Sequence, residues 1–110
     1  MRFFSIVPGL FWITALLGPP PVGAQAIEDV AIRDYRFQPA ELKVRVGTTV
    51  RWTNQEKRTS HSVLFSGEGG QESDRLFPGE SWQRVFDHPG VFSYRCGPHP
   101  EMQGAVVVSE

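Results

Sequence analysis

Apolar and polar residues alternate with a period of two along most of the chain beyond its N-terminal stretch. Val30 and Ile32 fall on one face of a short segment, and the residues between and beside them fall on the other. The same alternation recurs at Leu42 and Val44, whereas no stretch shows a convincing helical stripe and residues 71–77 hold at most one turn. A period of two predicts β-strands that bury one face.

Glycine- and proline-rich turn signals separate the alternating segments. Pro-Gly pairs at 78–79 and 89–90 each precede a predicted strand. Residues 67–74 are polar and rich in glycine, which predicts a loop. About seven short strands with turns between them indicate an all-β fold. We predict an antiparallel Greek-key β-sandwich formed by residues 27–110.

The beginning of the chain has a different character. Residues 3–17 are almost all apolar, three consecutive prolines follow, and Ala24 and Ala26 form the A-x-A pattern of a cleavage site. We expect residues 1–26 to be a secretory signal peptide that is cleaved after Ala26 or Ala24. The alternative is an uncleaved membrane anchor, but the apolar run is short for a bilayer span and has no basic flank after it.

Charge and cysteine content narrow the possible functions. The chain has 110 residues and a formal net charge of −1 at pH 7, so its charge does not indicate nucleic-acid binding. Cys96 is its single cysteine, so an exported form has no partner for an internal disulfide. Cys96 is then a reactive thiol, an intermolecular link, a buried apolar residue or a metal ligand.

Three side chains that bind metals lie close together in the sequence. Cys96, His99 and Met102 occupy a predicted loop that follows a strand. A thiolate, an imidazole and a thioether suit copper better than zinc, magnesium or calcium. Pro98 and Pro100 flank the histidine and stiffen the loop, because proline fixes φ and restricts the residue before it. The pattern predicts a soft-metal site that keeps nearly the same geometry in two oxidation states.

A fourth ligand has to come from elsewhere in the chain. His61 lies where a loop becomes a predicted strand, and His88 lies in a turn between two strands. A histidine in a turn is usually only solvated, which disfavours His88. Alone, His61 would also be a surface residue more often than a ligand, but its combination with the Cys96 loop favours metal binding.

The chain resembles the cupredoxins, the small blue-copper proteins, and most closely their amicyanin and plastocyanin branch. The resemblance rests on the Cys-x2-His-x2-Met loop at 96–102 and on the sequences of 37–54 and 77–92, and it spans nearly all of residues 28–109. The two residues between the loop histidine and the methionine are typical of the short, amicyanin-like form.

The resemblance implies a type 1 copper site with one copper ion per chain. Carried over by position, His61, Cys96 and His99 are the equatorial ligands and Met102 is the weak axial ligand. It also implies transfer of single electrons between redox partners. Because four ligands leave no open position for a substrate, we expect no enzymatic activity, and we expect the mature protein to be a periplasmic monomer.

The resemblance also implies where partners bind. In the family the loop histidine, here His99, usually reaches the surface within an apolar patch, to which Pro98 and Pro100 would contribute. The alternative is that both prolines only shape the loop. Expected partners are a c-type cytochrome, a periplasmic dehydrogenase or an oxidase that binds through a small interface. We expect no nucleic-acid partner and no membrane insertion after cleavage of the signal peptide.

Two departures from the family pattern surround the first histidine. The interval from Asn54 to His61 is one residue longer than in typical relatives, and Ser62 stands where many relatives have asparagine. In the family that asparagine braces the cysteine loop by hydrogen bonds. Serine is shorter and can do only part of this, so we expect an effect on the reduction potential and none on the choice of copper.

Other functions remain open. A copper carrier or storage protein of the same fold would hand over the ion itself, although four enclosed ligands favour retention. A thiol enzyme would use Cys96 as nucleophile and His99 as base, but no third group that would orient them is evident. A metal-free sandwich used for binding is disfavoured by the ligand set, and a zinc site is disfavoured by the methionine.

Overall fold

The computed structural model describes residues 26–67 and 69–110. The regular secondary structure of these residues consists of eight strands, which confirms the predicted all-β class. No helix among the described residues is long and apolar enough to cross a membrane. The predicted signal peptide, residues 1–26, lies outside the described residues except for Ala26.

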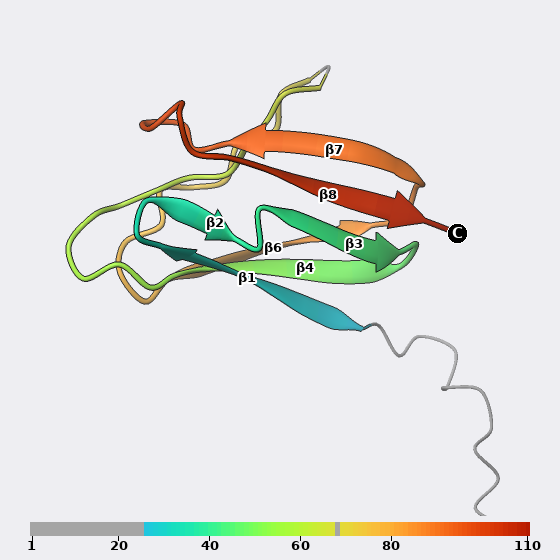
Figure 1. Ribbon diagram of the computed structural model, residues 1–110, viewed down its shortest axis with the longest axis horizontal. Helices are drawn as coiled ribbons and strands as arrows, with labels where there is room; N and C mark the ends of the chain where they lie inside the picture. Colours follow the sequence, from blue (N-terminus) through green and yellow to red (C-terminus); the bar gives the residue numbers. More distant parts are fainter. Residues whose placement is uncertain (1–25, 68) are drawn as a thin grey trace, which may run out of the picture.

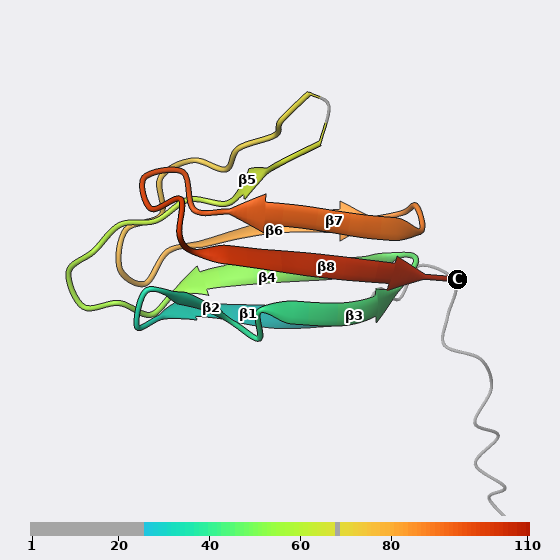
Figure 2. The same cartoon turned by 45° about the horizontal axis from the view of Figure 1, so that its top comes forward.

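The strands form two four-stranded sheets that face each other (Figure 1). The first has the spatial order β2-β1-β4-β6 and consists of β1 (Ile27–Arg33), β2 (Arg36–Gln38), β4 (Thr48–Asn54) and β6 (Ser81–Phe86). The second has the order β3-β8-β7-β5 and consists of β3 (Glu41–Arg45), β5 (Leu64–Phe65), β7 (Gly90–Arg95) and β8 (Gln103–Ser109). Figure 2 shows β5 at the edge of the second sheet, beside β7.

The sheets are mixed, whereas the alternation pattern predicted an antiparallel sandwich. β1 pairs with β4 in parallel, β3 pairs with β8 in parallel, and the other named pairs are antiparallel. The chain crosses from the first sheet to the second directly after β2, so β3 enters beside the C-terminal strand. Periodicity reports which face of a strand is buried and contains no information about the direction of its neighbour.

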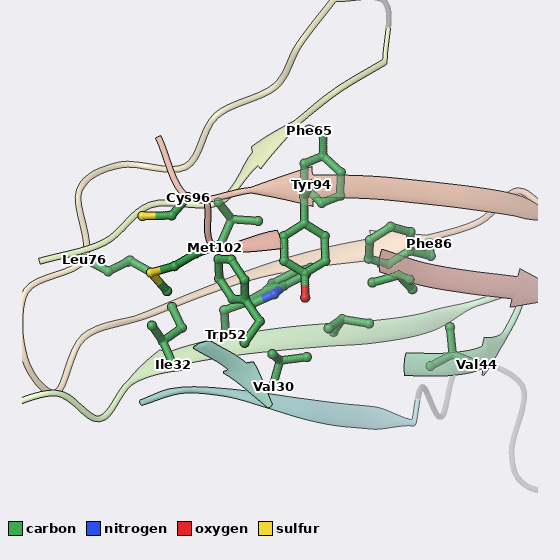
Figure 3. Packing of buried hydrophobic residues seen from close by; sticks show 14 of the residues in the cluster. Val30, Ile32, Val44, Trp52, Phe65, Leu76, Phe86, Tyr94, Cys96 and Met102 are labelled. Atoms are coloured by element: carbon green, nitrogen blue, oxygen red, sulfur yellow. The ribbon is translucent and has the colours of Figure 1, made fainter. Parts of the chain in front are cut away.

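The core lies between the two sheets and is rich in aromatic rings (Figure 3). Val30 and Ile32 of β1 are fully buried, which confirms the face that their alternation predicted. Trp52 of β4 and Tyr94 of β7 meet across the sandwich in a T-shaped contact, with ring centroids 5.4 Å apart. Such aromatic pairs contribute about 0.5–1.5 kcal/mol beyond the burial of their area.

Asn54, at the end of β4, connects two loops by hydrogen bonds close to the candidate site. Its side chain is fully buried and its Nδ2 donates to the carbonyl oxygens of Thr59, at 2.8 Å, and Leu76, at 2.9 Å. Its Oδ1 accepts a hydrogen bond from the backbone N–H of Glu56 at 2.9 Å. One buried amide therefore holds the loop after β4 against the loop before β6.

Candidate metal centre

The loop after β7 is closed at its base by its own backbone. Cys96 directly follows the strand and is fully buried. Its N–H donates to the carbonyl oxygen of Met102, and the N–H of Met102 donates to that of His99, both at 2.9 Å. The three side chains that the sequence placed on one loop are therefore held on one short, hydrogen-bonded turn.

His61 reaches this turn from the other side. Its backbone exchanges two hydrogen bonds with Leu76, with N···O distances of 3.0 and 2.7 Å, so the segment is fixed between two loops. The His61 side chain is fully buried, and its Nε2 lies 3.3 Å from Oε1 of Glu56. A carboxylate on one ring nitrogen orients the imidazole and directs the other nitrogen, Nδ1, towards the loop.

Two histidine nitrogens and one cysteine sulfur converge at a single point. Cys96 Sγ lies 3.5 Å from Nδ1 of His61 and 3.4 Å from Nδ1 of His99, and the two nitrogens are 3.2 Å apart. Three donor atoms at the corners of such a triangle can all bind one ion. The set of two imidazoles and one thiolate fits copper in an electron-transfer site.

The sequence offered two further possible ligands, Met102 and His88, and the structure places them at opposite ends of the sandwich. Met102 is 2 % exposed, and Figure 3 shows its sulfur at the same end of the core as that of Cys96. Its role as axial ligand stays a prediction. His88 lies in the turn between β6 and β7, at the opposite end of β7 from Cys96, with its side chain 83 % exposed beside Asp87. His88 is therefore not part of the triangle.

Burial sets the protonation of both buried donors. Burial lowers the pKa of His61, because it disfavours the imidazolium; the hydrogen bond with Glu56 opposes this shift and the neighbouring His99 adds to it. Burial also raises the pKa of the Cys96 thiol, against the hydrogen bonds from the backbone of Ser62 and His99. His61 is thus ready to donate its lone pair, while Cys96 has to lose a proton when a metal binds.

Tyr35 and Glu56 cover the histidines and were not found by the sequence reasoning. The Tyr35 ring makes T-shaped contacts with the rings of both His61 and His99, with centroids 5.6 and 5.3 Å apart. Its backbone N–H donates to Glu56 Oε1 at 2.8 Å, the oxygen that also faces His61. No local pattern marks either residue, because the contact depends on a turn with positive φ at Tyr35.

Sequence comparison finds copper proteins along almost the whole chain. Residues 24–109 match the family described as copper binding proteins, plastocyanin/azurin family. Amicyanin-alpha from Methylorubrum extorquens is 37% identical over 84 residues, which cover 73% of this chain and 70% of that protein. Amicyanin from Paracoccus denitrificans is 33% identical over 96 residues, which cover 80% of this chain and 72% of that protein.

Structural comparison also finds similarity to copper proteins. A reduced tryptophan-to-tyrosine variant of amicyanin superposes with a TM-score of 0.73 at 32% identity, covering 78% of this chain and 85% of that one. The Cu(I) form of a methionine-to-alanine variant superposes with a TM-score of 0.72 at 32% identity, covering 76% and 82%. With its sandwich fold and its His61, Cys96 and His99 triangle, the chain belongs to the plastocyanin/azurin family of copper-binding proteins, and copper is its cofactor.

Proposed function

We propose that this protein carries single electrons between redox proteins, with His61, Cys96, His99 and Met102 as the ligands of one type 1 copper ion. The observation that carries the proposal is the buried triangle of two imidazole nitrogens and one sulfur, with sides of 3.2–3.5 Å. A copper ion held there supplies a one-electron couple between Cu(I) and Cu(II).

The surroundings of the triangle suit a carrier better than a catalyst. Both segments that supply donors are held by backbone hydrogen bonds, so the donor atoms are positioned before any ion binds. His61 and Cys96 are fully buried, which keeps water away from the donors. With Met102 as the fourth ligand, no position is left for a substrate, so the proposal includes no enzymatic activity.

Electrons would enter and leave through His99. Its imidazole is partly exposed, and the neighbouring Pro98 and Pro100 are exposed. Tyr35, which is 50 % exposed, packs against the same imidazole and extends this apolar surface. We propose that a c-type cytochrome, a dehydrogenase or an oxidase binds here through a small interface, and that the carrier itself is a monomer.

The proposed place of action is the periplasm. Support comes from the apolar composition of residues 3–17 and from the A-x-A pattern at 24–26. Expression with the whole N-terminal sequence, followed by N-terminal sequencing of the periplasmic fraction, tests this. We expect a mature chain that begins at Ile27 or Gln25, and an intact Met1 on membrane-bound protein would show an uncleaved anchor.

Cyclic voltammetry of the copper-loaded protein tests electron transfer directly. We expect one reversible one-electron wave, together with the intense absorption of a thiolate bound to Cu(II). A colourless Cu(II) complex would exclude a type 1 site. A blue protein that passes its copper rapidly to a chelator, and shows no reversible wave, would instead be a copper carrier.

A further inference from the structure

Ser62 joins the segment of the first histidine to the cysteine loop at two points. Its backbone N–H donates to Cys96 Sγ at 3.4 Å. Its side-chain Oγ accepts a hydrogen bond from the backbone N–H of Gly97 at 3.0 Å. Ser62 is only 2 % exposed, so these groups have little access to solvent and depend on each other.

The direction of the second hydrogen bond depends on a third residue. A serine hydroxyl has a single hydrogen and accepts only through its lone pairs. The Ser62 hydroxyl donates that hydrogen to Oε2 of Glu72 at 2.8 Å. A carboxylate oxygen that carries no proton can only accept, so the hydroxyl is the donor in this hydrogen bond. Glu72 therefore turns the lone pairs of Ser62 towards Gly97.

Backbone hydrogen bonds hold Glu72 beside Ser62. The residues before and after it are bonded to the segment that follows Ser62: Gln71 accepts from the N–H of Phe65, and the N–H of Ser73 donates to Val63, both at 2.9 Å. Glu72 lies opposite Leu64 in this short antiparallel bridge. The loop before β6 is thus attached beside Ser62 and does not merely pass near it.

The cysteine loop has room for this arrangement only because residue 97 is glycine. A Cβ atom on Gly97 would overlap the Glu72 carboxylate and crowd Ser62 Oγ. The carbonyl oxygen of the same peptide, that of Cys96, lies 3.4 Å from Nη1 of Arg95, which also lies 3.3 Å from the Gly97 carbonyl oxygen in the next peptide. Both polar groups of Gly97 are therefore held, directly beside the proposed ligand Cys96.

We propose that Glu72 is a positioning residue of the copper site, which holds the Cys96–Gly97 peptide through the hydroxyl of Ser62. The chain of donors runs from the Gly97 N–H through Ser62 to the Glu72 carboxylate. A short serine thereby braces the loop with the help of a carboxylate from a different loop. This inference rests on the proposed function in one respect, the role of Cys96 as a ligand.

The hydrogen-bonded chain from Gly97 through Ser62 to Glu72 is called the brace below. Hydrogen exchange of the Gly97 amide in metal-free protein tests it without copper. We expect Glu72→Ala and Ser62→Ala to speed this exchange about three- to tenfold, as the loss of one hydrogen bond implies. Glu72→Gln should stay within about twofold, because its amide oxygen still accepts from Ser62. The matched control is Asp74→Asn, which removes a charge from the same loop. The amide of Val106 in β8 reports any change of global stability.

Copper retention tests whether the brace matters at the metal. Residues that hold metal ligands in place typically change metal affinity about 10- to 100-fold when they are replaced. We expect Glu72→Ala to lose copper to a chelator about tenfold faster than wild type, and Glu72→Gln to resemble wild type. In a Ser62→Asn background Glu72→Ala should have no further effect, because a carboxamide oxygen needs no partner to orient it.

The outcomes separate this inference from the proposed function. A wild-type protein without blue colour overturns the type 1 assignment, whatever happens at Gly97. A blue wild type in which Glu72→Ala changes neither Gly97 exchange nor copper loss overturns the brace alone. Equal effects of Glu72→Ala and Glu72→Gln on Gly97 exchange would also overturn it, since then charge and not hydrogen bonding would matter.

Discussion

The protonation and the solvent exposure of each donor residue in the metal centre depend on the residues around it. Cys96 is buried, so its thiol keeps its proton until a metal ion replaces it. Burial lowers the pKa of His61 and favours its neutral imidazole, whereas Glu56 opposes this shift and orients the ring. His99 alone among the three is partly exposed. One site thus combines two enclosed donors with one that can face a partner.

Replacing the sulfur donor is the first prediction at this scale. Cys96→Ser should abolish the intense absorption of the Cu(II) protein, because the absorption belongs to the thiolate–copper bond. The spectrum of copper-loaded protein measures this, and the exposed His88→Ala is a matched control that should keep the colour. An intense band that persists in Cys96→Ser would show that Cys96 is not a ligand.

The second prediction at the residue scale concerns the effect of Met102 on the reduction potential of the copper site. Met102→Gln should retain copper and lower the reduction potential, because an oxygen donor favours Cu(II) over Cu(I) compared with a thioether. Voltammetry of both proteins under the same conditions measures the shift. An unchanged potential would mean that the buried methionine sulfur is not coordinated.

The ends of the strands, and not the strands themselves, bring the donors together. The loop after β4 supplies His61, the loop after β7 supplies the other candidate ligands, and the loop before β6 supplies Glu72 and the partner of His61, Leu76. Asn54, at the end of β4, bonds to two of these loops at once. The geometry of the metal centre therefore depends on contacts between loops that are far apart in sequence.

Asn54→Ala tests that dependence. It would leave the buried carbonyl oxygen of Leu76 and the partly buried one of Thr59 without this donor, and we expect a loss of about 2–4 kcal/mol in the free energy of unfolding. Urea denaturation of the metal-free protein measures it. Arg51→Ala on the same strand is the control, because its ion pair with Asp29 is exposed and screened by solvent, so its loss should have little effect on stability. Equal losses in both variants would contradict a fastening role for Asn54.

The phenol hydroxyl of Tyr94 is buried in the core of the sandwich. Tyr94 is 2 % exposed, and its hydroxyl makes no hydrogen bond of standard geometry within the ranges 26–67 and 69–110, although the Trp52 side chain acts on it as a weak donor and opposes the effect of burial. Burial raises its pKa from 10.0 to about 12. A raised pKa in the folded state means that the fold favours the neutral phenol, so this stabilisation is complete below pH 10 and is lost as the pH rises towards 12.

We therefore expect alkaline unfolding that depends on this residue. Between pH 10 and pH 12 the metal-free protein should lose about 2 kcal/mol of stability through Tyr94, since each pKa unit corresponds to about 1.4 kcal/mol and the group is only half ionised at each end of this range. Thermal unfolding across this range measures it, and Tyr94→Phe should remove that part of the pH dependence. An unchanged alkaline profile in Tyr94→Phe would contradict the assignment.

Local sequence determined which residues make strands and which residues could bind a soft metal. A period of two showed the buried faces of β1 and β3, because alternate side chains of a strand point to opposite sides. Cys96, His99 and Met102 are close in sequence, so their spacing alone placed them on one loop. His61 required its combination with the Cys96 loop, because its own surroundings in the sequence do not distinguish it from a solvated histidine.

Only the tertiary structure decided what surrounds the metal centre. Tyr35, Glu56 and Glu72 reach the proposed ligands or the loop that holds them from three different loops, through contacts that no periodicity encodes. The parallel pairing of β1 with β4 could not be predicted from periodicity for the same reason. Periodicity and spacing act over a few residues, whereas these contacts depend on how the whole chain folds back on itself. The sequence thus determined the donors and their faces, and the fold determined how they are held.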